Sequence, residues 1–145
     1  MNMVAIRVKR LHESATLPRY AHTGEHGDLA ADLCSVEDLV FKRGDVKTIS
    51  TGIALELPPG YGGIIADRSG LAVKGFTTFA GVVDPGYRGE LRVVAGYFGE
   101  EPLSIKVGDR IAQLRIVRRI GATFDEVEEL GKTDRSERGF GSTGR

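Results

Sequence analysis

Glycine constrains the fold of this chain most, because its 20 glycines outnumber its 5 prolines and fall between short strand-like stretches. Ile53–Leu57 alternates in polarity and ends at Pro58-Pro59-Gly60, which predicts a strand followed by a turn. Leu91–Phe98 and Ile111–Val117 are aliphatic runs of strand length. The glycines have no fixed period, which excludes collagen-like and solenoid folds. Short strands with dense turns predict an all-β sandwich, jelly roll or small barrel.

Helical signals are weak. Ser69–Lys74 is long enough for one or two turns, and Phe124–Leu130 is an acidic segment of ambiguous structure. No stretch keeps a 3.6-residue period long enough for a core helix. The last stretch, 131–145, is polar and glycine-rich like a disordered terminus, which leaves Phe140 within it unexplained. We therefore expect one β domain over residues 1–130 and a flexible C-terminal arm over residues 131–145.

Charge and cysteine content exclude several classes of protein. The 20 basic and 20 acidic side chains give a net charge of +0, so no overall positive field favours a nucleic acid duplex or an anionic membrane. The single cysteine, Cys34, cannot form an internal disulfide, and the role of a small buried apolar residue suits it. Met1–Arg10 lacks the apolar core of a signal peptide, and no apolar run could span a bilayer. We expect a soluble cytoplasmic protein without stable nucleic-acid binding and without a membrane partner.

Three segments carry residues suited to phosphate chemistry. Asp67–Leu71 offers a guanidinium, a hydroxyl and flexible backbone for a phosphate, although such triplets are also common surface turns. Gly108–Leu114 places Gln113 in an apolar strand, where a buried amide needs a structural or a ligand partner. In Gly81–Gly89, Asp84 follows two valines and precedes a Pro-Gly turn, which suits either a rigid general base or a turn-closing carboxylate. No Walker-type loop, Rossmann fingerprint, Ser-His-Asp set or zinc pattern accompanies them.

Taken in order and with their spacings, five segments resemble the motifs of the trimeric dUTPase (deoxyuridine 5'-triphosphate nucleotidohydrolase) family over nearly the whole chain. These segments are Ala31-Asp32-Leu33, Asp67–Ala72, Gly81–Gly89, Gly108–Leu114 and Thr133–Gly144. The resemblance implies a distorted jelly-roll or β-barrel subunit with at most one short helix, and a homotrimer with sites at subunit interfaces. It also implies Mg²⁺-dependent hydrolysis of dUTP to dUMP and pyrophosphate, which keeps uracil out of DNA and supplies dUMP for thymidylate synthesis.

The same resemblance implies roles for individual residues. Asp84 would activate the water that attacks the α-phosphorus, and Tyr87 would pack on the deoxyribose and exclude a 2′-hydroxyl. Phe140 would stack on the uracil, whose edge the backbone around Phe79–Val83 would read. The other implied substrate-binding residues are Arg68, Ser69, Gly70 and Gln113 at the phosphates, Thr78, Gly81, Val82, Val83 and Arg92 elsewhere in the site, and Arg135, Gly141, Ser142 and Thr143 in the closing arm. The Mg²⁺ would be held by triphosphate and water, with Asp32 in its outer shell and no direct protein ligand.

Three positions depart from the family pattern. Ala30-Ala31 replaces the Gly-aromatic pair that usually precedes the Asp of the first motif. Asp67 stands where Pro or Gly is more common, and this extra carboxylate could weaken triphosphate binding or help to recruit metal. Ser136-Glu137-Arg138 replaces a Gly-rich stretch of the fifth motif. Either Arg135 or Arg138 could therefore close the site, and the spacing to the aromatic residue favours Arg135.

The nearest alternative is dCTP deaminase, a relative with the same fold. Asp84-Pro85-Gly86-Tyr87 resembles the third motif of that family more than the usual dUTPase version. However, Val94 stands where the deaminase carries a catalytic Glu, and Gly70 stands where it has a second Ser. These positions disfavour both a deaminase and a bifunctional enzyme. A non-catalytic nucleotide-binding module on the same fold is the other alternative, which the retention of Asp84, Tyr87 and Gln113 disfavours.

Overall fold

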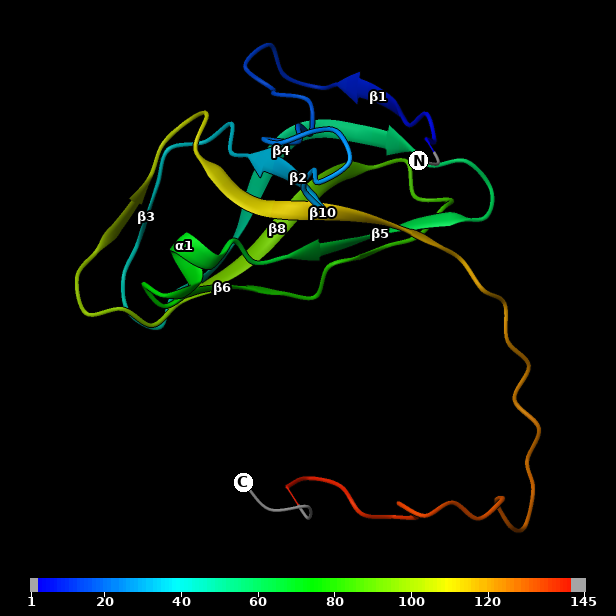
Figure 1. Cartoon of the computed structure of the whole chain (residues 1–145). Helices are drawn as coiled ribbons and strands as arrows, with labels where there is room; N and C mark the ends of the chain where they lie inside the picture. Colours follow the sequence, from blue (N-terminus) through cyan, green and yellow to red (C-terminus); the bar gives the residue numbers. More distant parts are fainter. Residues whose placement is uncertain (1–2, 142–145) are drawn as a thin grey trace.

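The computed structural model describes residues 3–141. In this part of the chain there are ten β-strands and one four-residue helix (Figure 1). They are β1 (Arg7–Arg10), β2 (Ala31–Cys34), β3 (Leu39–Phe41), β4 (Val46–Glu56), β5 (Tyr61–Ala66), α1 (Ser69–Ala72), β6 (Phe76–Phe79), β7 (Val82–Val83), β8 (Glu90–Tyr97), β9 (Leu103–Ile105) and β10 (Arg110–Arg118). The expected all-β class with at most one short helix is confirmed. Between residues 3 and 141, no helix has the length and apolar character that a bilayer crossing requires.

The strands form two four-stranded sheets and one two-stranded sheet. The first large sheet has the order β1-β4-β8-β6, the second has the order β2-β10-β5-β7, and β3 pairs with β9. Every pairing between these strands is antiparallel. Strands β6 and β7 follow one another in the chain but belong to different sheets. The short segment that joins them therefore crosses from one sheet to the other, and this crossing creates the candidate site described below.

One apolar core fills the space between the two large sheets. The buried residues include Ile49 and Ile53 of β4, Val93 and Ala95 of β8, Ile65 of β5, and Ile111 and Leu114 of β10. The rings of Phe41 and Phe76 meet edge to face, with centroids 5.3 Å apart and an interplanar angle of 82°. Aromatic pairs favour this geometry, which adds to the stabilisation from burial. The core thus fixes β6 and β8, which carry half of the residues that line the cavity described below.

The predicted strands Leu91–Phe98 and Ile111–Val117 agree with β8 and β10 to within one residue at each end. Strand β4, in contrast, is longer than predicted. Strand β4 begins at Val46, well before the predicted Ile53–Leu57 run. Its pairing with β8 shifts between Ser50 and Ala54, where Gly52 has a φ of +70°. This bulge interrupts the alternation of side chains, so the sequence pattern reveals only the last part of the strand.

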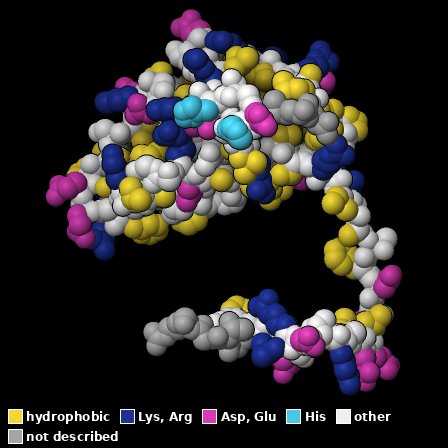
Figure 2. Space-filling view, viewed as in Figure 1, with side chains coloured by type: hydrophobic (Ala, Val, Ile, Leu, Met, Phe, Trp, Pro, Cys, Tyr) yellow, Lys and Arg dark blue, Asp and Glu magenta, His cyan; other side chains and the backbone are white. Residues whose placement is uncertain are grey.

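Beyond β10 the chain leaves the body of the domain as an extended segment (Figure 1). Its first residue, Arg119, still donates a backbone hydrogen bond to the carbonyl of Gly60 at 2.8 Å. From Ile120 to Arg138 every residue is exposed, and the ambiguous segment Phe124–Leu130 forms no helix. Figure 2 shows hydrophobic side chains standing out along this segment, and acidic and basic side chains intermixed over the visible face of the domain. Apolar side chains such as that of Phe124 therefore lack a partner within one chain.

Candidate active site

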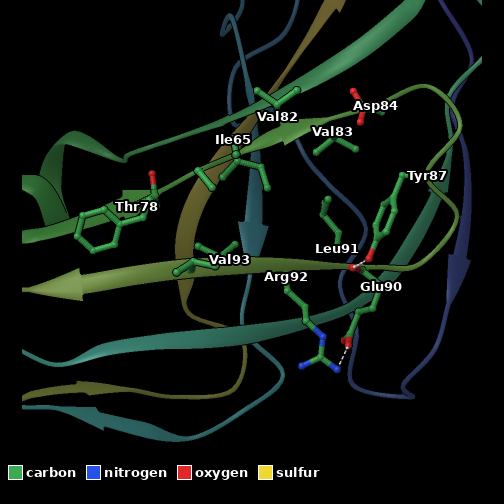
Figure 3. A pocket seen from close by; sticks show the side chains of 14 residues that line it. Ile65, Thr78, Val82, Val83, Asp84, Tyr87, Glu90, Leu91, Arg92 and Val93 are labelled. Atoms are coloured by element: carbon green, nitrogen blue, oxygen red, sulfur yellow. Dashed lines mark hydrogen bonds and ion pairs between the residues drawn. The ribbon is translucent and has the colours of Figure 1, made fainter.

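A cavity of about 250 Å³ lies between β8 and the segment that joins β6 to β7 (Figure 3). Its lining contains many of the residues that the sequence assigned to the substrate, namely Thr78, Gly81, Val82, Val83, Asp84, Tyr87 and Arg92. The other lining residues are Ile65, Phe79, Ala80, Glu90, Leu91, Val93 and Val94. The cavity is largely apolar, with a few polar groups at its edge, as small-molecule sites usually are.

Main chain forms the wall of the cavity at the crossing between the sheets. Ala80 and Gly81 both have positive φ values, of +62° and +127°. The amide of Ile65 donates a hydrogen bond to the carbonyl of Gly81 at 2.7 Å. A Cβ atom on Gly81 would lie 2.7 Å from the carbonyl oxygen of Ile65, so only glycine fits there. A flat ligand in the cavity would meet backbone groups at this wall, because the side chains of Phe79, Ala80 and Val82 carry no polar atoms.

Asp84 comes directly after β7, at the edge of the cavity. The amide of Tyr87 donates to the carbonyl of Asp84 at 3.1 Å, which closes the turn over Asp84-Pro85-Gly86-Tyr87. Proline fixes one φ angle in this turn and so limits its conformational freedom. The carboxylate of Asp84 is exposed. The structure therefore provides an acidic side chain on a rigid turn that solvent can reach.

Tyr87 stands beside Asp84 and is 48% exposed. Its Oη donates a hydrogen bond to the main-chain carbonyl of Glu90 at 2.8 Å (Figure 3). A Cβ atom on Gly89 would lie 2.5 Å from this Oη, so the glycine leaves the room that the phenol needs. The ring is thereby held along the edge of the cavity and stays half-exposed.

Glu90 is a lining residue that the sequence analysis missed. Its carboxylate accepts hydrogen bonds from the amide of Gly52, at 2.9 Å, and from the hydroxyl of Ser50. It also forms an ion pair with Arg92, at 2.8 Å between Oε1 and Nη2, and only 16% of its side chain is exposed. Glu90 therefore braces the bulge of β4 and orients Arg92. An acidic residue at the start of an apolar strand is the only signal in the sequence that could have indicated it.

The residues predicted to hold phosphate lie in a second group, around the ends of β5 and β10. Nε of Arg68 lies 3.1 Å from Oδ1 of Asp32, and Nη1 of Arg110 lies 3.5 Å from Oδ2 of the same carboxylate. Ser69 and Gly70 are exposed at the start of α1. Two guanidinium groups thus share one carboxylate, and their remaining N–H donors can bind an anion such as phosphate.

Gln113 belongs to this second group. Its Nε2 donates a hydrogen bond to the main-chain carbonyl of Asp67 at 2.7 Å. In this chain the half-buried amide therefore has a structural partner, which was one of the two explanations that the sequence left open. The bond also connects β10 to the segment that carries Arg68.

The extra carboxylate of Asp67 points toward β6. It accepts hydrogen bonds from the hydroxyl of Thr77 and from both the amide and the hydroxyl of Thr78. Partial burial acts to raise the pKa of Asp67, but the bonds from Thr78 and Thr77 together outweigh it, so the pKa lies below its ordinary value. Asp67 is therefore an ionised and fully engaged group rather than a free charge.

Cys34, in β2, is a free and half-buried thiol. Burial raises the pKa of this thiol, and the nearby negative charge of Asp32 raises it further. A raised pKa keeps the thiol protonated and unreactive. Among residues 3–141 no three His, Cys, Asp or Glu side chains are grouped so that they could hold a metal ion.

Within one chain the structure does not bring all predicted site residues together. The cavity lining excludes Arg68, Ser69, Gly70 and Gln113. Phe140 is fully exposed on the extended segment, and Nε of Arg135 donates to the carbonyl of Arg138 at 2.7 Å, not to the domain. Gly141 is exposed beside Phe140, while Ser142 and Thr143 lie outside the described residues. The predicted residues thus form a cavity group, a second group around Arg68, and a distant group on the extended segment.

Val94 lies in β8 and lines the cavity with an apolar side chain. It pairs with Thr48 of β4 and with Phe79 of β6, so its backbone is fixed on both sides. The position at which the sequence comparison with dCTP deaminase expects a catalytic carboxylate is therefore inside the cavity, but it offers no group that can transfer a proton. This geometry argues against dCTP deaminase activity.

Comparison with known proteins agrees with this arrangement. The family model described as dUTPase matches residues 17–144. The chain is 46% identical to the deoxyuridine 5'-triphosphate nucleotidohydrolase of Thermobifida fusca, over 97% of this chain and 79% of that protein. It is 42% identical to the enzyme of the same name from Solibacter usitatus, over 97% of this chain and 96% of that protein.

Solved structures give the same result. The structure of the Staphylococcus bacteriophage 80alpha dUTPase with dUPNHPP superposes with a TM-score of 0.85 at 27% identity, and the match covers 99% of this chain and 100% of that one. A mutant dUTPase from phage phi11 of S. aureus, whose structure concerns the coordination of a structural Mg(II) ion, has a TM-score of 0.78 at 25% identity, with 87% and 98% covered. Sequence and fold therefore agree over nearly the full length, and the chain belongs to the dUTPase family.

Proposed function

We propose that this enzyme hydrolyses dUTP to dUMP and pyrophosphate, with Asp84 as the general base. The observation that carries the proposal is that Asp84 and Tyr87 flank one cavity, whose wall at Gly81 is main chain. A wall of backbone donors and acceptors can bind the edge of a pyrimidine without polar side chains. The carboxylate next to it is exposed on a rigid turn, where a general base can reach a water molecule.

The proposed chemical step is attack of water on the α-phosphorus. Asp84 accepts a proton from the water as the new phosphorus–oxygen bond forms. The bond between the α-phosphorus and the oxygen that bridges it to the β-phosphorus breaks, and pyrophosphate leaves with that oxygen. A positive side chain and neutral hydrogen-bond donors around the phosphates stabilise the charge that accumulates in the transition state. We assign this stabilisation to Arg68, Ser69, Gly70 and Gln113.

Selection of the sugar and base is assigned to the cavity. Tyr87 is held at the cavity edge by its bond to Glu90, so its ring can pack on a deoxyribose and leave no room for a 2′-hydroxyl. Thr78, Val82, Val83 and Arg92 complete the surroundings of the nucleoside. Because a hydrogen-bonding wall rejects ligands that leave its groups unpaired, this arrangement favours one base over others.

We propose a homotrimer in which neighbouring subunits complete each site. The cavity group and the group around Arg68 are both needed for a nucleoside triphosphate, yet the cavity lining excludes Arg68 and Gln113. A second copy of the chain can supply the missing group, because closed symmetric oligomers place the same surface at every interface. In such a trimer, the exposed apolar side chains after β10 can pack on the surface of a neighbouring subunit.

The C-terminal arm, residues 131–145, is proposed to close over the bound substrate on the β domain of residues 1–130. Phe140 is a fully exposed aromatic, which is costly in water unless it has a partner in the active state. We assign it to stacking on the uracil. Arg135, with Gly141, Ser142 and Thr143, is assigned to the γ-phosphate end, since closure of a segment can exclude water and complete a site.

Mg²⁺ is the proposed cofactor. The carboxylate of Asp32 is already paired with Arg68 and Arg110, so it suits contact with coordinated water rather than direct ligation. Hard oxygen ligands from the triphosphate and from water fit this ion. When bound, the ion would neutralise phosphate charge. The relative from phage phi11 is described with a structural Mg(II) ion.

A cytoplasmic location is proposed from the chemistry of Cys34. Its free thiol has a raised pKa and suits a reducing compartment, where free thiols persist. The substrate and product also belong to the nucleotide pool that supplies DNA synthesis. Lowering dUTP there would keep uracil out of DNA and supply dUMP for thymidylate synthesis.

The decisive experiment is an incubation with dUTP, dCTP and dTTP in separate reactions with Mg²⁺, followed by identification of the products. We expect dUMP and pyrophosphate from dUTP, and no turnover of dCTP or dTTP. Release of ammonia from dCTP would instead identify a deaminase. Binding of dUTP without any turnover would identify a non-catalytic module.

A further inference from the structure

The carboxylate of Asp67 is held entirely by strand β6. Its Oδ1 accepts hydrogen bonds from the amide N and the Oγ1 of Thr78, both at 2.6 Å. Its Oδ2 accepts from Oγ1 of Thr77 at 2.9 Å. Hydrogen bonds to an ionised acceptor are shorter and roughly twice as strong as neutral ones. Asp67 therefore forms a strong link to a single neighbouring strand.

The two sides of this link differ in rigidity. Thr77 and Thr78 pair with Gly96 and Ala95 of β8, and Ala95 is completely buried. The segment after Asp67 has no such support, because α1 is four residues long and has no side-chain cap. Ser69 and Gly70 within it are exposed. Asp67 thus ties a weakly supported segment to a strand that the core already holds.

A second bond acts on the same residue from the other side. Nε2 of Gln113, in β10, donates to the main-chain carbonyl of Asp67 at 2.7 Å. Asp67 is consequently fixed through its side chain by β6 and through its backbone by β10. Arg68 follows it directly in the chain and reaches Asp32 at 3.1 Å. The bonds to the side chain and to the backbone of Asp67 therefore fix the position of the Arg68 backbone.

We propose that Asp67 is a positioning residue for the phosphate-binding segment, which holds Arg68, Ser69 and Gly70 in place relative to the triphosphate. This inference rests on the proposed function, in which that segment binds phosphate. Asp67 itself touches no substrate and acts through Arg68. A small displacement of a positioned group is enough to lower a reaction rate strongly.

The variant Asp67→Asn tests this role with almost no change in shape. An amide has one acceptor oxygen and two N–H donors, so it cannot accept all three bonds from Thr77 and Thr78. At least one donor would lose its acceptor, and the link to β6 would weaken. Thr78 also lines the cavity, but its backbone pairing with Ala95 of β8 does not depend on Asp67, so the shape of the cavity should be retained. The binding affinity should therefore fall for ligands with several phosphates and stay the same for ligands with one phosphate.

The measurements are the dissociation constants of the analogue dUPNHPP and of dUMP, together with kcat and KM for dUTP, on the full chain with Mg²⁺. For Asp67→Asn we expect about tenfold weaker binding of dUPNHPP and a kcat roughly ten- to a hundredfold lower. Binding of dUMP should change by less than about twofold, because the cavity is retained. Asp45→Asn is the matched control, since Asp45 accepts a backbone bond from Lys42 in a turn outside the site.

Thr77→Val provides an independent test that leaves Asp67 and the cavity lining in place. It removes one donor to Asp67 and should reduce dUPNHPP binding by a smaller factor than Asp67→Asn does. In the double variant the two effects should not add, because both act on the same link. Should Asp67→Asn fail to fold, the comparison of dUPNHPP with dUMP in Thr77→Val still decides the matter.

Three results would overturn the inference. These are equal losses for dUMP and dUPNHPP, unchanged affinity for both ligands, and full additivity of the two substitutions. A wild-type protein that does not hydrolyse dUTP would instead refute the proposed function. The two failures are thus distinguishable in one set of measurements.

Discussion

The Oη of Tyr87 donates a hydrogen bond to the main-chain carbonyl of Glu90, 2.8 Å away, across the turn that leads from Asp84 into β8. Glu90 is itself anchored, because its carboxylate accepts a bond from the amide of Gly52 in β4. The aromatic ring at the cavity edge is therefore fixed by a chain of contacts that ends in the first sheet. A ring held in this way can act as a rigid steric wall for a sugar.

Replacing Tyr87 with Ala should allow the enzyme to accept UTP. The substitution removes the ring that would meet a 2′-hydroxyl, so the preference for dUTP over UTP in kcat/KM should fall by about tenfold or more. Tyr87→Phe is the control, since it keeps the ring and loses only the bond to Glu90. Unchanged discrimination in Tyr87→Ala would show that another group excludes the ribose.

Asp84→Asn should stop catalysis while it preserves binding. The amide has nearly the same shape but cannot accept a proton from water, so kcat should fall by about a hundred- to ten-thousand-fold. The affinity for dUPNHPP should remain within about threefold, because the carboxylate is not assigned to binding. Asp45→Asn, which makes the same chemical change in a distant turn, should keep full activity. A fully active Asp84→Asn enzyme would remove the general base from the mechanism.

Deleting residues 131–145 should abolish most hydrolysis without unfolding the domain. Residues 120–138 are exposed, and among residues 3–141 the last backbone hydrogen bond from the extended segment to the domain is at Arg119. Residues 131–141, the described part of the arm, therefore contribute nothing to the core packing. Circular dichroism should show the same cooperative melt, while kcat/KM for dUTP should drop at least about a hundredfold if closure completes the site. A melt that loses its cooperativity would show instead that the arm is structural.

Gly81→Ala should damage the cavity wall and the domain together. The added Cβ would lie 2.7 Å from the carbonyl oxygen of Ile65, at a φ of +127°. We expect a loss of about 1–3 kcal/mol in unfolding free energy, together with weaker dUMP binding. Gly86→Ala is the matched control for stability, because a Cβ atom there meets nothing within 4 Å. Equal melting temperatures for the two variants would contradict the proposed strain.

The all-β class and three of the described strands, β4, β8 and β10, follow from local patterns in the sequence, and the departure in β4 comes from a contact between distant segments. Strands β8 and β10 are continuous aliphatic runs, so their predicted limits agree with the observed ones within one residue. Strand β4 is predicted only in its last part, because the bulge at Gly52 breaks the alternation. That bulge depends on the carboxylate of Glu90, which is 38 residues away in the chain. A contact of this kind leaves no periodic signal in either segment.

For a similar reason, the sequence predicts where some site residues lie but not the contacts that other site residues make. Asp84 and Tyr87 share one short turn, so a local motif is enough to place them at the same cavity. The sequence gives no indication that Asp67 bonds to Thr77 and Thr78, because β5 and β6 belong to different sheets. The partner of Gln113 is likewise fixed only by the pairing of β10 with β5. Roles that depend on tertiary pairing thus require the structure.

Acid should weaken the link made by Asp67. Its pKa lies below the ordinary value of 3.8, since the bonds from Thr78 and Thr77 favour the ionised form over the neutral form that burial favours. A lowered pKa in the folded state means that the carboxylate stabilises the fold at pH values above 3.8, and that this stabilisation is lost as the pH falls through the folded-state pKa. The difference in unfolding free energy between wild type and Asp67→Asn, measured by denaturant titration from neutral to acidic pH, should therefore be constant near neutrality and shrink in acid. Thr77→Val should shift the decline to higher pH, because it removes one bond that favours the ionised form. A difference that stays constant across this range would show that the charge of Asp67 contributes nothing to the link.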